Sequence, residues 1–147
     1  MRLVKRSRVR FWHTDPARIV YYPRFFEWFH DIFEASFEEA SGIPYADILN
    51  RLRIGFPVVQ LATEFRRPVF FGDVVDLEIF LSRMSDRSAT FEYRVRKDGV
   101  LHATASIKVA AMHMDTAQPA TIPEDIRAAF ASWIETDDER PNPERIR

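Results

Sequence analysis

Apolar side chains recur every three or four residues between residues 23 and 41, and this spacing predicts one long amphipathic helix. Pro23 suits the first helical position, because its fixed φ matches a helix and its missing N–H would have no partner there. Gly42 suits the residue that ends the helix. The apolar positions cover more than half of the helix circumference, so a second layer, most simply a sheet, must cover them. They are Phe25, Phe26, Trp28, Phe29, Ile32, Phe33, Ala35, Phe37 and Ala40.

Much of the remaining chain alternates between apolar and polar residues, as strands with one buried face do. Lys97-Asp98-Gly99-Val100 is typical of a tight turn between two such strands. A short helical turn is also expected within residues 44–52. The later strands are too closely spaced for helical crossovers, so the sheet should be antiparallel. The predicted strands cover residues 3–11, 56–67, 74–84, 89–97 and 101–111.

A second helix is predicted to begin at Pro123, with Ile126 and Phe130 on its apolar side. The residues after it are polar and include proline, so we expect a single domain at residues 1–135 and a polar tail at 136–147. The predicted fold class is α+β. An antiparallel sheet wraps around one long apolar helix, and a C-terminal helix is added to it.

The overall charge and composition exclude several classes of protein. The 147 residues include 21 basic and 22 acidic ones, and the net charge of −1 favours neither nucleic acid nor a membrane as a partner. The absence of cysteine excludes disulfides, thiol catalysis and cysteine-based zinc sites. No stretch reaches the roughly 20 apolar residues that cross a bilayer. We therefore expect a cytoplasmic protein. His102 and His113 have no acidic partner at ligand spacing, so no metal site is expected either.

The most informative short segment places Asp15 just before the long aromatic helix. A helix N-terminus presents unpaired N–H groups and a partial positive charge of about half a unit. A carboxylate beside it can promote attack on an activated carbonyl while the N–H groups hold the resulting oxyanion. Asp-Pro also favours turns, so a purely structural role for Asp15 is the alternative.

The segment Asp15-Pro16-Ala17-Arg18-Ile19-Val20-Tyr21-Tyr22-Pro23 resembles the signature loop of the 4-hydroxybenzoyl-CoA thioesterase family. That loop reads Asp-Pro-Ala-Gly-Ile-Val, then two aromatic residues and proline. The resemblance continues through the helix and covers about residues 5–115. It implies the hotdog fold and hydrolysis of an acyl-CoA. By position, Asp15 would act as nucleophile or as general base for water, and the backbone N–H of Tyr22 would polarise the thioester carbonyl.

The resemblance also implies how the protein assembles and holds CoA. Such enzymes are dimers or dimers of dimers with active sites between subunits, so we expect a homodimer or a homotetramer. CoA is part of the substrate, and no separate cofactor is expected. Arg83, Arg87 and Ser88 would bind the CoA phosphates. Arg18 stands where the family usually has glycine, so either the loop differs or Arg18 reaches toward an anionic part of the substrate.

Four further side chains near this loop are candidates for contact with substrate. Phe25 and Phe26, in the first turn of the helix, are predicted to touch the ligand. His30, about two turns along, either reads a polar group of the acyl moiety or fills an interior or interface position. His13 could aid proton transfer beside Asp15, although a histidine near a strand end is more often structural.

Charged residues on the predicted strands have two interpretations each. Glu64 is either a pocket carboxylate or the ion-pair partner of Arg66. A basic edge on the first strand either binds phosphate or is a solvated face, and the solvated face is favoured. This edge consists of Arg6, Arg8 and Arg10.

The sequence therefore predicts an acyl-CoA thioesterase that uses Asp15 and the amide end of the helix. The resemblance and the rings near the helix start favour a small aromatic acyl group, although aromatic walls also suit alkyl chains. One alternative is a hydratase or dehydratase of acyl thioesters, for which His13 with Asp15 is the available pair. Another is a non-catalytic acyl-CoA sensor, which would keep the pocket without needing Asp15.

Overall fold

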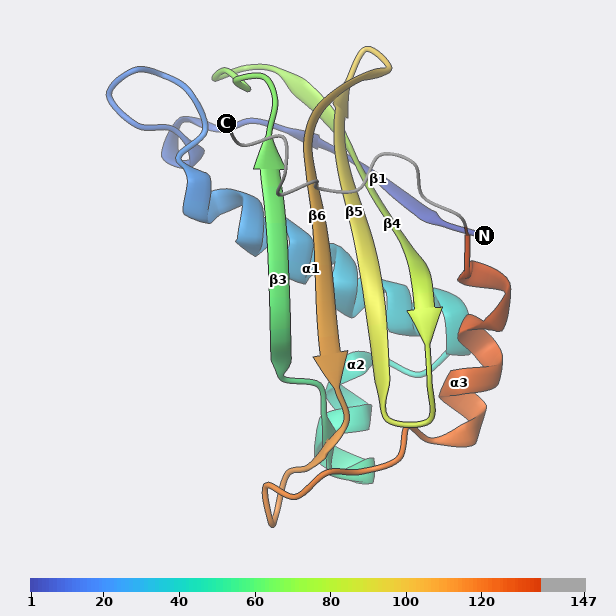
Figure 1. Ribbon diagram of the computed structural model, residues 1–147. Helices are drawn as coiled ribbons and strands as arrows, with labels where there is room; N and C mark the ends of the chain where they lie inside the picture. Colours follow the sequence, from blue (N-terminus) through green and yellow to red (C-terminus); the bar gives the residue numbers. More distant parts are fainter. Residues whose placement is uncertain (136–147) are drawn as a thin grey trace.

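The computed structural model describes residues 1–135, so the predicted tail at 136–147 lies outside the described residues. Five strands form an antiparallel sheet in the order β1-β4-β5-β6-β3. Two short strands, β2 and β7, pair with each other beside it (Figure 1). The strands are β1 (Leu3–Arg8), β2 (Ile54–Gly55), β3 (Val58–Phe65), β4 (Val74–Met84), β5 (Ser88–Lys97), β6 (Val100–Ala110) and β7 (Met112–His113).

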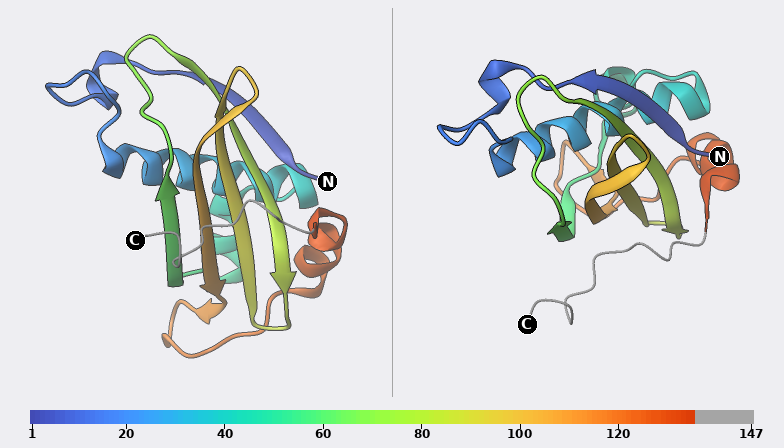
Figure 2. Two further views of the ribbon diagram at one scale, coloured as in Figure 1. Left: turned by 45° about the horizontal axis from the view of Figure 1, so that its top comes forward. Right: turned by 90° about the horizontal axis from the view of Figure 1, so that it is seen from above.

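One long helix, α1, runs along one face of the sheet (Figures 1 and 2). A shorter helix, α3, lies beside the β4 side of the sheet (Figure 1). No helix within residues 1–135 is long and apolar enough to span a membrane. The helical segments are η1 (Phe11–His13), α1 (Tyr22–Ser41), α2 (Tyr45–Asp47), η2 (Ile48–Leu52), α3 (Glu124–Phe130) and η3 (Ala131–Trp133).

Aromatic packing fixes α1 against the sheet. The ring centroid of Phe29 lies 5.0 Å from that of Tyr93, and the ring of Phe33 lies 5.1 Å from that of Phe91. Phe37 contacts Phe130 of α3 at 5.2 Å. Burying each such side chain contributes about 1.5–3 kcal/mol. The predicted apolar stripe is thus the face that packs on the sheet, and this packing sets where the start of α1 lies.

The predicted element boundaries differ from the structure at several places, and three of these differences bear on the site. Helix α1 begins at Tyr22, one residue earlier than predicted, so Pro23 takes the second helical position. The first strand ends at Arg8 instead of residue 11, because the next residues leave the sheet and form η1. The strand predicted at residues 56–67 is shorter in the structure, where β3 runs from Val58 to Phe65. Pro57, which has no N–H to donate, separates it from the short strand β2 at Ile54–Gly55.

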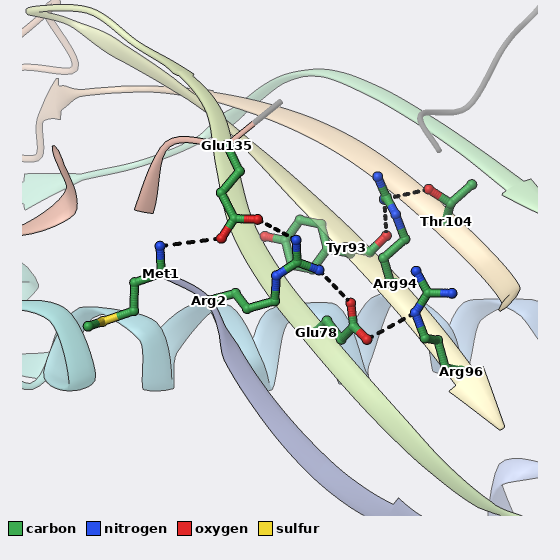
Figure 3. Close-up of polar contacts among 8 residues, drawn as sticks. All are labelled: Met1, Arg2, Glu78, Tyr93, Arg94, Arg96, Thr104 and Glu135. Atoms are coloured by element: carbon green, nitrogen blue, oxygen red, sulfur yellow. Dashed lines mark hydrogen bonds and ion pairs between the residues drawn. The ribbon is translucent and has the colours of Figure 1, made fainter. Parts of the chain in front are cut away.

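The outer face of the sheet carries ion pairs that join the two ends of the described chain (Figure 3). Glu78 accepts hydrogen bonds from Arg2 and Arg96, both at 3.0 Å. Arg2 also pairs with Glu135, whose carboxylate lies 3.3 Å from the amino group of Met1. The hydrogen bond from Arg2 lowers the pKa of Glu135. These contacts hold β1 and the segment after α3 against β4.

Two charged residues of β5 are fully buried on this outer face, although their positions in the alternating pattern suggest solvent contact. Glu92 accepts hydrogen bonds from Ser82 at 2.5 Å and from Ser106 at 3.1 Å. Arg94 donates to the hydroxyl of Thr104 at 2.6 Å (Figure 3). Burial is tolerated because each charge has hydrogen-bond partners on neighbouring strands.

Candidate active site

The loop between η1 and α1 is a tight turn centred on Asp15. The side-chain Oδ1 of Asp15 accepts the N–H of Ala17 at 2.8 Å. Its backbone carbonyl accepts the N–H of Arg18 at 2.8 Å, and its N–H donates to Ile19 at 3.0 Å. Among residues 1–135 no donor is recorded for the second carboxylate oxygen, Oδ2. One carboxylate oxygen of Asp15 therefore stabilises the turn, as the structural interpretation predicts. The turn also fixes the direction of the other oxygen, which stays available to a ligand.

Arg18 adopts the left-handed conformation, with φ of 63°. This costs a residue other than glycine about 1–2 kcal/mol. The conformation is fixed from both sides, because the N–H of Arg18 donates to Asp15 and its carbonyl accepts the N–H of Phe71 at 3.0 Å. The loop thus adopts the backbone geometry that glycine allows most easily. The exposed side chain of Arg18 forms no ion pair with any residue in the described part of the chain.

The start of α1 offers backbone donors beside this loop. Tyr22 is the first helical residue, so its N–H has no carbonyl one turn earlier to bond. Among residues 1–135, no side chain caps this end of the helix. The preceding residue is anchored, since the N–H of Tyr21 donates to the carbonyl of His13 at 2.9 Å. A free N–H at the positive end of a 20-residue helix is suited to binding an oxyanion.

Asp15 and the start of α1 line a single cleft of about 420 Å³. The rings of Phe25 and Phe65 form part of its wall, with centroids 5.0 Å apart. The loop after β3 closes the cleft, because the N–H of Val20 donates to the carbonyl of Val69 at 2.8 Å. The structure therefore brings together three of the predicted site residues. These are Asp15, Tyr22 and Phe25.

The opposite wall of this cleft was not predicted from the sequence. Phe65, Arg66 and Arg67 line it at the end of β3. Their position depends on the pairing of residues 69–71 with 18–20, which no local pattern in the sequence indicates.

Phe26 and His30 lie outside the Asp15 cleft. They line a separate apolar groove of about 320 Å³ between α1 and strands β3 and β6, together with Leu61 and Tyr93. Nε2 of His30 lies 3.0 Å from Glu34, and both side chains are more than half exposed. Within one chain, the predicted ligand contacts of the helix therefore belong to two different hollows.

The residues predicted to hold the CoA phosphates lie at the far end of the sheet. Arg83 is near the end of β4, Arg87 lies in the turn to β5, and Ser88 is the first residue of β5, where its hydroxyl contacts that of Ser85. The Asp15 loop lies at the opposite end (Figure 1). The 11 residues of β4 at about 3.3 Å each span roughly 36 Å. One chain alone cannot place these residues beside Asp15.

His13 has a structural environment. It is 4% exposed, and its Nδ1 accepts the N–H of Arg10 at 2.7 Å. Its ring packs edge-on against Trp28 at 4.9 Å. Burial, with the nearby charge of Arg24, lowers the pKa of His13. His13 lines a different hollow from Asp15, which removes the pair that the hydratase alternative needs.

Two of the remaining charged candidates, Glu64 and Arg6, have ion-pair partners. Glu64 accepts a hydrogen bond from Arg66 at 2.9 Å, as the ion-pair interpretation predicts. On the basic edge, Arg6 pairs with Asp76 at 3.0 Å. Within residues 1–135 no group of three or more histidine, aspartate or glutamate side chains is arranged to bind a metal ion.

A family model described as the thioesterase-like superfamily matches residues 9–130. The chain belongs to this superfamily. It is 29% identical over 140 residues to a 1,4-dihydroxy-2-naphthoyl-CoA hydrolase of Prochlorococcus marinus, covering 90% of this chain and 89% of that protein. A hydrolase of the same name from Synechococcus is 32% identical over 136 residues, covering 86% and 85%.

A solved structure of a gentisyl-coenzyme A thioesterase is similar to this chain with a TM-score of 0.80 and 29% identity. The similarity covers 88% of this chain and 100% of that one. The expected hotdog fold and the expected class of enzyme, a thioester hydrolase acting on acyl-CoA, are thereby confirmed.

Proposed function

We propose that this thioesterase hydrolyses a hydroxylated aryl-CoA, with Asp15 and the backbone N–H of Tyr22 as its catalytic groups. The observation that carries the proposal is that a half-buried carboxylate and an uncapped helix N-terminus line one aromatic cleft. A thioester carbonyl placed there would accept the Tyr22 N–H while Asp15 faces the carbonyl carbon. This assigns to Asp15 and Tyr22 the roles that the sequence analysis gave them.

The chemistry requires few other groups. Asp15 either attacks the carbonyl carbon, forming an anhydride that water then cleaves, or removes a proton from water as the water attacks. In both routes the carbonyl oxygen becomes an oxyanion, and the Tyr22 N–H stabilises it. Removing one such donor typically costs about 10²–10³ in rate. The C–S bond then breaks and CoA leaves as a thiolate, which needs little help from a general acid.

Two observations support an aryl substrate. Rings form part of the cleft wall, and the aromatic residues that line it with Asp15 are Tyr21, Tyr22, Phe25 and Phe65. Relatives of about 30% identity are named for the hydrolysis of 1,4-dihydroxy-2-naphthoyl-CoA and gentisyl-CoA. We therefore propose a hydroxylated aryl group in preference to an alkyl chain.

We further propose that two copies of the chain pair along β3 to complete the site. β3 is an edge strand with exposed apolar side chains, Val58 and Val59 at 56% and Leu61 at 44%. A two-fold axis through this edge would reverse the strand direction of the second copy. The phosphate-binding candidates of the second copy, Arg83, Arg87 and Ser88, would then lie at the same end as Asp15.

The same pairing gives a role to the separate groove on α1. The groove of the second copy, with Phe26 and His30, would lie across the shared edge from the Asp15 cleft. The rings of that groove would then cover the outer side of the aryl group held in the Asp15 cleft, with His30 facing the same group. The homodimer is the smallest assembly that satisfies this geometry. We also propose membership of the narrower 4-hydroxybenzoyl-CoA thioesterase family and a cytoplasmic location.

The test is release of CoA thiol from benzoyl-CoA, hydroxybenzoyl-CoA, phenylacetyl-CoA, and short- and long-chain acyl-CoAs. Wild type should be fastest on the hydroxylated aryl substrate, and Asp15→Asn should lose several hundredfold in kcat, on the order of other essential catalytic groups. Binding of a non-hydrolysable thioether analogue should change little. Tight binding without turnover by wild type would instead favour an acyl-CoA sensor.

A further inference from the structure

Arg67 differs from its neighbour on the wall of the Asp15 cleft. Arg66 is paired, with its Nε 2.9 Å from the carboxylate of Glu64. Arg67 forms no ion pair with any carboxylate among residues 1–135, and the one polar contact recorded for its side chain is with a neutral carbonyl. The cleft therefore contains one guanidinium whose charge no acidic side chain of the described chain offsets.

The segment that carries Arg67 is held by four hydrogen bonds to residues 101 and 102. The N–H groups of Arg66 and Arg67 both donate to the carbonyl of His102, at 2.8 and 3.1 Å. Nδ1 of His102 lies 3.1 Å from the carbonyl of Pro68, so it must donate this bond. The guanidinium of Arg67 donates through Nη1 to Leu101 at 3.1 Å. Its position is thus set before any ligand binds.

This anchoring leaves most of the guanidinium available. Arginine has five N–H donors in a planar fork, and the bond to Leu101 uses one of them. A guanidinium held in this way loses little further freedom when it binds a carboxylate or phenolate. The side chain of Arg67 is exposed, so its remaining donors are accessible to a ligand that enters the cleft.

The position of Arg67 also indicates which part of the substrate carries the anionic group that Arg67 would bind. Asp15 lines the same cleft, so its negative charge would repel a second anionic group close to the thioester unless a cation offsets it. A cleft of about 420 Å³ accommodates an aryl thioester group but not an extended pantetheine arm that ends in the CoA phosphates. A group that meets Arg67 here therefore lies on the acyl side of the thioester.

We propose that Arg67 is a specificity-determining residue that binds an acidic oxygen substituent, a phenol or a carboxylate, on the acyl group of the substrate. This proposal rests on the proposed function of the Asp15 cleft. It assigns no chemical step to Arg67, since binding one substituent selects the substrate without taking part in bond cleavage.

The experiment compares kcat/KM for benzoyl-CoA with that for the 2-, 3- and 4-hydroxybenzoyl isomers. Arg67→Gln should lower kcat/KM for the preferred hydroxybenzoyl isomer by about tenfold to a hundredfold, as loss of a charged hydrogen bond does. Benzoyl-CoA should change by less than about threefold, because it lacks the bound oxygen. Arg67→Lys should recover part of the preference, since it keeps the charge without the fork. Arg51→Gln, an exposed arginine outside both hollows, is the matched control.

Two outcomes would overturn the assignment to Arg67. An equal loss of kcat/KM on all four substrates would mean that Arg67 supports the loop and binds no substituent of the acyl group. Pantetheine thioesters of the same acids, which lack the CoA phosphates, provide the second comparison. If the effect of Arg67→Gln disappears with them, Arg67 binds a CoA phosphate instead of the acyl group.

A binding measurement separates this proposal from the catalytic one. Non-hydrolysable thioether analogues of benzoyl- and hydroxybenzoyl-CoA can be titrated into wild type, Arg67→Gln and Arg67→Lys by calorimetry. Selective loss of affinity for the hydroxylated analogue supports Arg67 even if Asp15→Asn were to keep its turnover, which would overturn only the catalytic role. If Arg67→Gln does not fold, Arg67→Lys still tests the preference, and an unchanged ratio of affinities would overturn it.

Discussion

The two edge strands of the sheet, β1 and β3, differ in the side chains that they expose: those of β1 are mainly basic, and those of β3 are mainly apolar. β1 carries Lys5, Arg6 and Arg8 among its six residues, and ion pairs on its outer face tie it to β4. β3 has no basic residue, and it exposes apolar side chains beside both hollows. Charged side chains on an edge discourage pairing with another chain, whereas an apolar edge permits it. The difference supports the proposal that assembly and ligand binding belong to the β3 side, with β1 on the other side of the fold.

The most severe test places the same substitution on each edge. Val59→Lys on β3 and Val4→Lys on β1 both add a charge at an exposed valine, 56% and 50% exposed respectively. Val59→Lys should convert the proposed dimer to monomer and lower kcat/KM by about tenfold or more, because like charges at an interface cost several kcal/mol. Val4→Lys should change neither quantity.

Sedimentation equilibrium gives the mass of each variant, and CoA release gives its activity. If Val4→Lys dissociates the protein and Val59→Lys does not, β1 is the pairing edge and the proposed site must be rebuilt. A fully active monomer would remove the need for a second copy altogether.

An effect of about 1 kcal/mol is expected on the opposite side of the fold, where Glu135 binds Arg2 and the amino terminus. The hydrogen bond from Arg2, ahead of the other nearby charges, lowers the pKa of Glu135 in the folded state. A depressed carboxyl pKa stabilises the fold above the pKa of the unfolded chain, and this stability is lost as the pH falls through the folded value. Glu135→Gln should thus lower the free energy of unfolding by up to about 1 kcal/mol at pH 7.

Urea unfolding at pH 7 and pH 3 measures this effect. The difference between wild type and Glu135→Gln should shrink at pH 3, where the carboxyl becomes protonated. A difference that stays constant between the two pH values would show that packing around residue 135, and not its charge, is responsible.

The smallest effect is expected at Arg18, on the side of the Asp15 cleft. Arg18→Gly removes the strain of φ 63° but gives the unfolded chain more freedom, so the free energy of unfolding should change by less than about 1 kcal/mol. Gly42, with φ of 72° and open space around it, provides the contrast. Gly42→Ala should destabilise the fold by about 1 kcal/mol. Thermal unfolding of the two variants tests this, and a large loss in Arg18→Gly would mean that its side chain supports the loop.

Local patterns in the sequence determined α1, the hairpin at residues 97–100 and the Asp15 loop. The spacing of the aromatic residues in α1 fixes which face is buried, since a helix has only one geometry. The order of residues 15–23 likewise places a carboxylate before a helix start, whatever the rest of the chain does. For this reason Asp15, Tyr22 and Phe25 were predicted together and are found lining one cleft.

Only the tertiary structure decided which residues face Asp15 across that cleft and which do not. Arg67 lies there because the loop after β3 pairs with residues 18–20, whereas Arg83 and Arg87 lie at the other end of β4. Both outcomes depend on strand order and register, which join residues more than 40 positions apart. Alternating patterns show which face of a strand is apolar, but they carry no information about its neighbour. The sequence therefore determined the Asp15 loop and its helix, and the order of the strands decided what surrounds them.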